Sequence, residues 1–232
     1  MRVLPSASAL MTESRAYLAC AAITREDAER NVPPPGATTG SMCEARGVAM
    51  VYFQEDELLQ RAGGLTAAAA QESLRAASKQ SGSFDVFLSH SVRDARLVLG
   101  VRRLLEAQGL SVYVDWIDDP QLDRGSVSPS TAARLRVRMG SSRTMVYATS
   151  RAAQSSRWMP WELGYFDGFH GPQRVSILPI EGPTTGSFAG QEYLGLYSVV
   201  DRVVGPYGAE PSVVLHESSN RQSFRSFAGR TR

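Results

Sequence analysis

Cysteine, histidine and lysine are scarce in this sequence. Cys20 and Cys43 are the only cysteines and the three histidines are scattered, so a disulfide framework or a zinc site is not indicated and a reducing cytosol fits. Lys79 is the only lysine, the arginines never run beyond a pair, and the formal net charge is +2. This distribution of positive charge is not that of a nucleic-acid-binding protein.

Long apolar runs are also missing. The most apolar run near the N-terminus, residues 16–23, is too short to span a membrane, and residues 1–10 lack the sustained apolar region of a secretion signal. We therefore expect a cytoplasmic protein without a transmembrane helix. The chain has 232 residues, of which 43% are hydrophobic, so it can bury one good core plus an appendage.

Residues 1–82 differ in composition from the rest of the chain. They are rich in alanine and are broken by the Pro-Pro-Pro-Gly run at residues 33–36, with helical patterns on either side. We therefore expect an N-terminal helical extension and linker before a domain at residues 83–232. A better-patterned segment begins at Met50, so we expect residues 1–49 to be dispensable, with translation starting at Met50 as the alternative.

From residue 84 onward, strand patterns alternate with helix patterns, which is typical of a parallel sheet covered on both faces. The predicted strands are residues 84–88, 110–114, 143–149, 174–180 and the second half of 191–200. Five strands with four crossovers predict a flavodoxin-like α/β fold with strand order 2-1-3-4-5. Ligands bind such sheets outside the carboxyl ends of strands one and three, where the winding reverses.

A carboxylate stands among aromatic residues just after the third predicted strand. Ser155 and Ser156 are good N-cap residues and Pro160 is tolerated only in a first turn, so a helix begins here. A spacing of four then places Trp158 and Glu162 on one face of that helix. The fold therefore predicts that Glu162 lies beside the ligand crevice.

The alternative for this helix is an ordinary amphipathic surface helix. In that case the aromatic stripe Trp161, Tyr165 and Phe169 is core, and Glu162 is a solvated charge stabilised by the helix dipole. A second open question concerns the acidic loop at residues 115–124. Loops of that length in compact domains are usually functional, but acidic residues and proline are also ordinary turn residues.

These segments resemble the Toll/interleukin-1 receptor (TIR) domain, in particular that of bacterial TIR proteins. Residues 84–91 resemble the first box of the family, and Tyr113-Val114-Asp115 with the acidic loop resembles its BB loop. Residues 158–163, Trp-Met-Pro-Trp-Glu-Leu, match its W-x-x-x-E helix. The resemblance covers roughly residues 83–205, and its three elements occur in the order of the family.

The resemblance implies an enzyme that cleaves NAD+ at the nicotinamide glycosidic bond, with Glu162 as the essential carboxylate. NAD+ is then the substrate, and neither a cofactor nor a metal is required. Trp158 would stack on a ring of the substrate or pack in the core. The resemblance also nominates residues that help to form the nucleotide pocket: Ser89, His90, Asp115 and Asp118. We expect His90 to be a polar pocket or capping residue, because nothing near it in the sequence would orient it as an acid–base catalyst.

The function implied is bacterial anti-phage defence or signalling through an NAD-derived product, linear or cyclic. The expected partners are NAD+, other copies bound through the BB loop (Asp115 to Arg124), and a downstream effector that senses the product. We expect no nucleic-acid or membrane partner. Two alternatives remain: a non-catalytic module that binds other TIR domains, and a nucleoside deoxyribosyltransferase, which fits the helix and loop less well.

Overall fold

The computed structural model describes six stretches of the chain: residues 43–45, 48–63, 82–119, 128–182, 191–205 and 208–230. Most of the expected extension and the second half of the acidic loop lie outside the described residues. None of the helices in the described stretches has the length and apolar character needed to cross a membrane.

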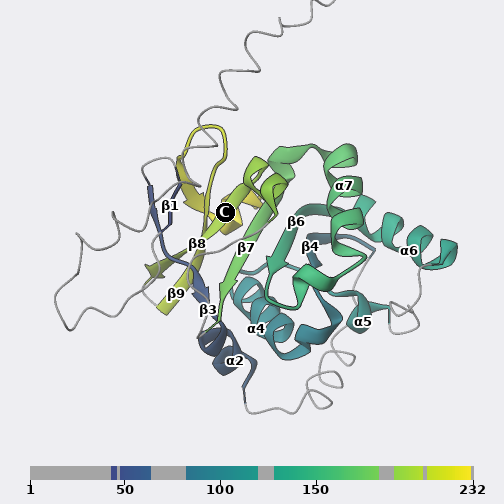
Figure 1. The fold of residues 1–232 in the computed structure, drawn as a ribbon, viewed down its shortest axis with the longest axis horizontal. Helices are drawn as coiled ribbons and strands as arrows, with labels where there is room; N and C mark the ends of the chain where they lie inside the picture. Colours follow the sequence, from purple (N-terminus) through teal and green to yellow (C-terminus); the bar gives the residue numbers. More distant parts are fainter. Residues whose placement is uncertain are drawn as a thin grey trace, which may run out of the picture. The chain divides into compact units, whose positions relative to one another are not determined.

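A mostly parallel sheet of eight strands lies at the centre of the domain (Figure 1). Its hydrogen-bonded neighbours follow the order β10, β9, β8, β7, β6, β4, β5, and β3 pairs with β7 off this path. The strands are β3 (Phe53–Gln54), β4 (Phe84–Ser89), β5 (Val112–Tyr113), β6 (Ser142–Thr149), β7 (Val175–Glu181), β8 (Ser198–Gly205), β9 (Gly208–Val214) and β10 (Arg221–Ser223).

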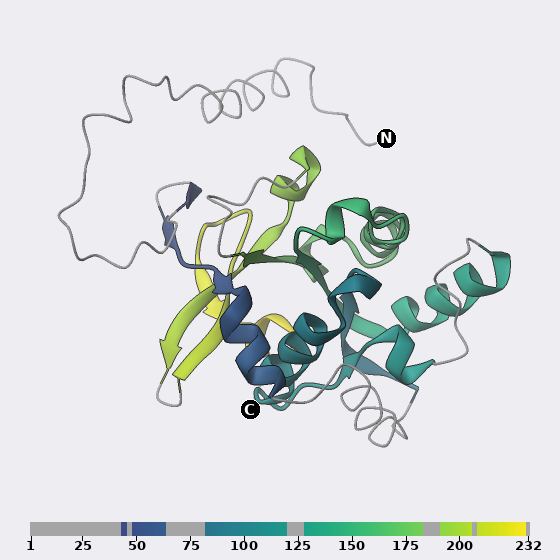
Figure 2. The same ribbon diagram turned by 60° about the horizontal axis from the view of Figure 1, so that its bottom comes forward.

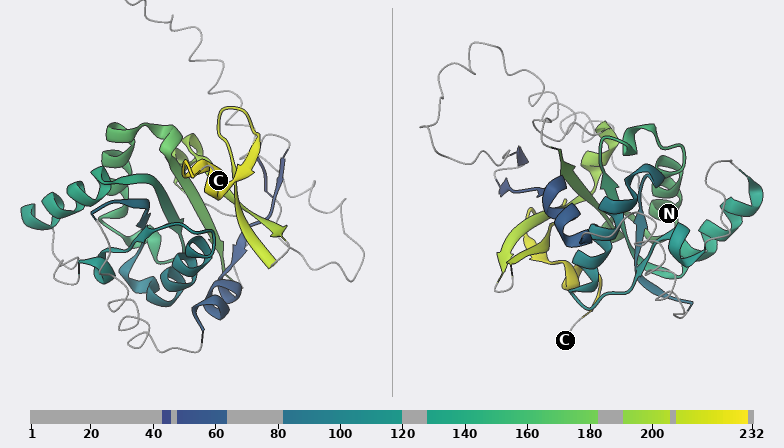
Figure 3. Two further views of the ribbon diagram at one scale, coloured as in Figure 1. Left: turned by 180° about the vertical axis from the view of Figure 1, so that it is seen from behind. Right: turned by 90° about the horizontal axis from the view of Figure 1, so that it is seen from below.

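Parallel pairs join β5, β4, β6, β7 and β8, whereas antiparallel pairs join β8, β9 and β10. The α/β architecture agrees with a flavodoxin-like TIR fold, but the expectation of five strands underestimates the sheet. Strand β3, from before residue 83, pairs with the interior strand β7, and β9 and β10 extend the sheet beyond β8. Figure 3 shows the β8–β9 hairpin at the opposite end of the domain from helix α6 (Pro129–Gly140).

Helices cover both faces of the sheet, as the sequence predicts. The core on one face contains α2 (Glu55–Ala62), α4 (Ala95–Glu106) and α8 (Phe224–Phe227), and the core on the other contains α6 and α7 (Met159–His170). Strand β4 serves both cores, because Val86 and Leu88 face the first and Phe87 the second. The short helices are α5 (Asp115–Asp118) and the 3-10 turns η2 (Val92–Asp94), η3 (Ala153–Ser155), η4 (Pro172–Arg174) and η5 (Glu192–Leu196).

Residues 50–62 pack into the same core as the rest of the domain, although the sequence suggests an extension up to residue 82. Phe53 and Leu58 are fully buried, and Phe53 pairs with Ile180 of β7 in parallel. Helix α2 lies along α4 (Figure 2). The described part of the expected helical extension also holds strands, because β1 (Cys43–Ala45) and β2 (Val48–Met50) form a separate antiparallel pair.

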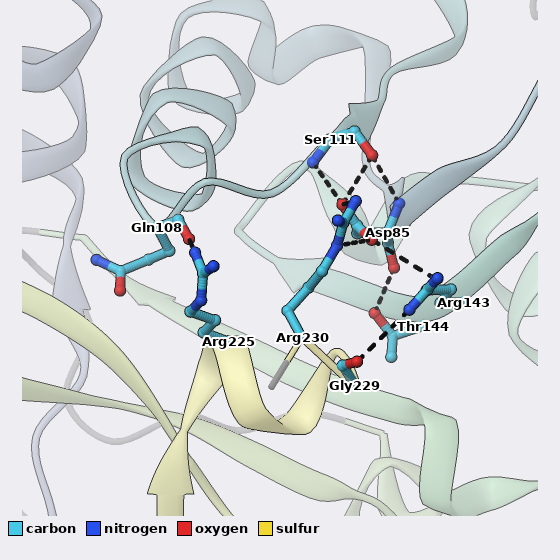
Figure 4. A network of polar contacts seen from close by, with 8 residues as sticks. All are labelled: Asp85, Gln108, Ser111, Arg143, Thr144, Arg225, Gly229 and Arg230. Carbon is cyan, nitrogen blue, oxygen red and sulfur yellow. Dashed lines mark hydrogen bonds and ion pairs between the residues drawn. The ribbon is translucent and has the colours of Figure 1, made fainter. Parts of the chain in front are cut away.

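The chain near its C-terminus is tied to the start of β4 by a buried carboxylate (Figure 4). Asp85 is only 1% exposed, and its carboxylate accepts hydrogen bonds from the backbone N–H and the hydroxyl of Ser111, each at 2.9 Å. Arg230 donates from Nε and Nη2 to the same carboxylate at 2.8 and 2.9 Å. Burial raises the pKa of Asp85, but these hydrogen bonds outweigh it and hold the pKa below its usual value. We call this group the Asp85 clasp.

Candidate active site

The predicted site residues come from the carboxyl ends of neighbouring parallel strands. Ser89 is the last residue of β4 and pairs with Tyr147 of β6, and α7 follows β6 through a short connection. Helix α7 has Pro160 in its first turn, as predicted, but its N-cap residue is Trp158 and not Ser155 or Ser156. The Ser156 hydroxyl nevertheless accepts a hydrogen bond from the Met159 N–H at 3.3 Å. Glu162 lies in that first turn, where the helix dipole favours negative charge.

Glu162 is completely buried, with 0% of its surface exposed. The hydroxyl of Ser89, also fully buried, donates to Glu162 Oε2 at 2.6 Å. A buried carboxylate requires such a partner, because the loss of hydration destabilises its charge. The bond therefore joins the end of β4 to the first turn of α7 and fixes the orientation of the carboxylate.

The alternative of an ordinary surface helix is wrong for α7. Trp161 and Tyr165 are half-buried and Phe169 is 60% exposed, so the aromatic stripe is not the core face. The three rings stack along the helix, with centroids 5.9 and 6.1 Å apart. The side chains that α7 buries are Met159, Glu162, Leu163 and Phe166. The acid thus points into the protein among apolar residues.

His90 and Asp115 form a second buried pair beside Ser89. Each is 1% exposed, and His90 Nε2 lies 3.4 Å from Asp115 Oδ1. The other ring nitrogen, Nδ1, lies 2.8 Å from the Leu88 carbonyl oxygen, so Nδ1 carries a proton and donates it. The Leu88 carbonyl, two residues away, and Asp115, the first residue of α5, therefore orient the His90 ring from its two nitrogens.

Asp118 and Asp119 hold the start of the acidic loop to the domain. Asp118 Oδ2 accepts from the Val114 N–H at 2.7 Å, and burial raises the pKa of Asp118 to about 6. Asp119 is 2% exposed and binds Arg138 of α6 through two hydrogen bonds of 2.7 and 3.0 Å. The described part of the loop, including the helix α5, is therefore anchored rather than solvated.

Trp158 is buried at the start of α7. It is 6% exposed, belongs to the core on the α6 and α7 face, and meets Trp161 edge to face at 5.5 Å between centroids. Its carbonyl accepts the hydrogen bond of the Glu162 N–H at 2.8 Å. In this structure Trp158 packs in the core, the second of its two expected roles.

The comparisons with known proteins identify two relatives, and no family model matches the chain. The chain is 47% identical over 139 residues to the "Probable 3′ cyclic ADP-D-ribose synthase ThsB′" of Bacillus cereus (strain MSX-D12), an alignment that covers 60% of this chain and 71% of that protein. The chain belongs to the bacterial TIR-domain family. A shorter stretch of this TIR protein, 83 residues or 35% of the chain, is 31% identical to 22% of the "Putative cyclic ADP-D-ribose synthase TIR2" of Cytobacillus dafuensis.

The structure of the TIR domain brings four of the six nominated residues together. The hydrogen bond between Ser89 and Glu162 joins β4 to α7. The contact between His90 and Asp115 joins the residue after β4 to α5. Asp118 instead faces the Val114 N–H and the Arg102 guanidinium, 3.8 Å away. In the described part of the chain, no group of three or more His, Cys, Asp or Glu side chains could hold a metal ion.

Two further side chains of the TIR domain lie at this edge of the sheet and were not predicted. The Asp94 carboxylate accepts a hydrogen bond from the hydroxyl of Ser150, which follows β6. Tyr147 of β6 lies near Glu162, since burial, Tyr193 and the charge of Glu162 together raise the pKa of the Tyr147 phenol. Only the position of Tyr147 in a strand that leads to the site could have signalled it.

Proposed function

We propose that this TIR protein is an NAD-consuming enzyme that cleaves the nicotinamide–ribose bond of NAD+ and releases a cyclic ADP-ribose. The observation that carries the proposal is Glu162, a fully buried carboxylate held by Ser89 at the edge of the sheet where the strand order reverses. The similarity to proteins named as cyclic ADP-D-ribose synthases supports the choice of substrate and product class.

For the cleavage step, the main contribution required of the protein is electrostatic stabilisation of the transition state. When the bond between C1′ and the nicotinamide nitrogen breaks, the electron pair leaves with nicotinamide, which becomes neutral and needs no general acid. An oxocarbenium-like ribosyl cation remains. The fixed carboxylate of Glu162 stabilises this cation, and the low polarity around it strengthens the interaction.

The fate of the ribosyl cation decides the product. If an oxygen or nitrogen of the same nucleotide attacks C1′ and loses its proton, the product is cyclic; if water attacks, the product is linear ADP-ribose. Exclusion of water therefore favours the cyclic product. Ser89, His90, Asp115 and Glu162 are each at most 1% exposed, so water has little access to these side chains.

The biological role follows from the same proposal. We place the reaction in the cytoplasm, in bacterial antiviral defence, with the cyclic product as a signal for a downstream effector. Self-association through the BB loop remains part of the proposal. Asp115 and Asp119 of this loop are buried within their own domain.

A non-catalytic interaction module is the weaker candidate. Binding between TIR domains uses exposed surface, whereas a carboxylate at 0% exposure contributes nothing to such a surface. Its desolvation also costs folding free energy. The burial of Glu162 therefore favours an enzyme over a module.

The test is to incubate the purified full chain with NAD+ and to follow nicotinamide and the nucleotide product by chromatography with mass detection. We expect nicotinamide and a product lighter than linear ADP-ribose by one water. Glu162→Gln keeps the shape of the side chain but removes its charge, so we expect at least a roughly hundredfold loss of turnover in a folded protein. Glu217→Gln, at an exposed position between β9 and β10, is the matched control.

Two outcomes would count against the proposal. Nicotinamide release near the wild-type rate by folded Glu162→Gln would remove the catalytic role of this residue. If linear ADP-ribose is the only nucleotide product from the first turnovers onward, the cyclase is wrong and a hydrolase remains.

A further inference from the structure

The short segment between β4 and α4 contacts three other connections at the active-site edge. Ser89 donates to Glu162 of α7, and His90 faces Asp115 of α5. Asp94, at the end of η2, accepts a hydrogen bond from the hydroxyl of Ser150, the first residue after β6. The first two contacts belong to the candidate active site described above, whereas the contact between Asp94 and Ser150 joins segments outside it.

Asp94 does not serve its own helix. It occupies the N-cap position of α4, where an aspartate normally accepts hydrogen bonds from the first free backbone N–H groups and contributes about 1 kcal/mol. In this structure its side chain makes no capping hydrogen bond. The carboxylate is directed instead to Ser150, 56 residues further along the chain.

Ser150 in turn shapes the path from β6 to α7. Both its carbonyl oxygen and its hydroxyl accept from the Ala153 N–H, at 3.2 and 3.1 Å, and this starts the turn η3. Ala153 is buried in the core beneath α7. Ser156 then accepts from the Met159 N–H at the start of α7. A continuous set of hydrogen bonds therefore runs from Asp94 to the first turn that carries Glu162.

We propose that Asp94 is a positioning residue for Glu162, which it places by fixing Ser150 and the connection between β6 and α7; this inference rests on the proposed function. Asp94 and Ser89 then hold the Glu162 helix at two points, its approach and its first turn. Loss of the Asp94 contact would leave NAD+ binding largely intact and displace the carboxylate from the ribosyl cation.

The experiment measures kcat and KM for nicotinamide release by Asp94→Ala, Ser150→Ala, their double variant and Asp94→Asn in the full chain. We expect each alanine variant to lose roughly tenfold in kcat, with KM changed by less than about twofold. The double variant should be no worse than the single ones by more than about twofold, because both remove the same contact. The amide of Asp94→Asn still accepts from Ser150 and should keep kcat within about threefold.

A second measurement does not depend on activity. Hydrogen–deuterium exchange followed by mass spectrometry should show faster exchange at residues 150–162 in both alanine variants and unchanged exchange in β7, which serves as the internal reference. Asp56→Ala is the matched control, since Asp56 is exposed on α2 and its carboxylate accepts a hydrogen bond from the neighbouring Glu57 N–H.

The outcomes separate this inference from the proposed function. A wild-type chain that releases no nicotinamide refutes the proposed function, while the exchange measurement still tests the contact. Wild-type kcat together with wild-type exchange in both alanine variants overturns the positioning role. A loss in Asp94→Asn as large as in Asp94→Ala also overturns it, because the charge of Asp94 and not its hydrogen bond would then be required.

Discussion

Asp118 and Asp119 are neighbours in the sequence, yet their surroundings shift their pKa values in opposite directions. Burial raises the pKa of Asp118 to about 6, and the Arg102 guanidinium at 3.8 Å only partly offsets this. Asp119 is also buried, but hydrogen bonds from Arg138 and Tyr113 more than compensate and lower its pKa. Near pH 5, Asp119 is therefore ionised while Asp118 is largely protonated.

The raised pKa of Asp118 predicts a dependence of stability on pH. Between its ordinary value of 3.8 and about 6, the folded state holds a proton that the unfolded state has lost, so the Asp118 contribution to stability falls as the pH rises through this window. Asp118→Asn should therefore increase the free energy of unfolding by about 2 to 3 kcal/mol at pH 8 and change it little at pH 4.

Urea unfolding at the two pH values measures this difference, with Asp56→Asn as an exposed control. A variant that is equally or less stable than the wild type at pH 8 would show that the Asp118 carboxylate is ionised in the native protein at little cost.

Some site residues could be predicted from local sequence patterns, whereas others depend on contacts that form only when distant segments pair in the fold. Glu162 was found because its helix follows a strand next to the point where the sheet reverses. The contact of His90 with Asp115 was not, since it exists only because β4 and β5 pair side by side. The contact of Asp94 was not visible either, because its partner Ser150 lies 56 residues further along the chain.

Among the elements, the apolar parallel strands were the most predictable. Strand β9 was missed because Gly208 and Pro211 ordinarily indicate a loop, yet both are tolerated in this antiparallel hairpin near the end of the sheet. Strand β3 has two residues and no pattern of its own. The buried face of α7 was ambiguous because both sides of the helix carry apolar residues, and the aromatic stripe Trp161, Tyr165 and Phe169 is half-buried to exposed.

The contact between α2 and α4 depends on one glycine. A Cβ atom at Gly100 would lie 2.1 Å from the Leu58 carbonyl oxygen, far inside contact distance, and the obstacle is backbone. We expect Gly100→Ala to push α2 away from α4 and to lower the free energy of unfolding by at least about 2 kcal/mol.

Gly164→Ala on α7 is the matched control for this change, because a Cβ atom there meets nothing within 4 Å. Alanine is the better helix former, so Gly164→Ala should stabilise the protein by about 0.5 to 1 kcal/mol. Urea unfolding of the two variants should thus give changes of opposite sign. Equal changes would show that the α2–α4 contact adapts without loss.

At the scale of the whole molecule, the boundary of the domain lies earlier than the sequence suggests. Composition changes near residue 83, but the polar contacts of residues 48–63 reach far along the chain. Arg202 of β8 binds Glu57 of α2 at 2.9 Å, and the Val51 N–H donates to buried Asp201 at 2.8 Å. Such partners are more than 140 positions away, so no local pattern could reveal them.

Two shortened chains test this boundary. A chain that begins at Met50 keeps β3 and α2, and we expect it to melt near the temperature of the full chain and to retain its turnover. A chain that begins at Ser83 exposes the core surface covered by Phe53 and Leu58 and should be insoluble or strongly destabilised. Comparable stability of the two shortened chains would show that residues 50–62 are not required for the stability of the domain.

The Asp85 clasp has a consequence for the order of events during synthesis. The ribosome releases β4 long before Arg230 is made, so the Asp85 carboxylate must wait for the guanidinium that permits its burial. Until then, the charge of Asp85 favours a state in which the start of β4 is exposed to water over one in which it is buried. The nascent chain therefore completes this end of β4, which lies opposite Glu162, only when residue 230 has emerged from the ribosome.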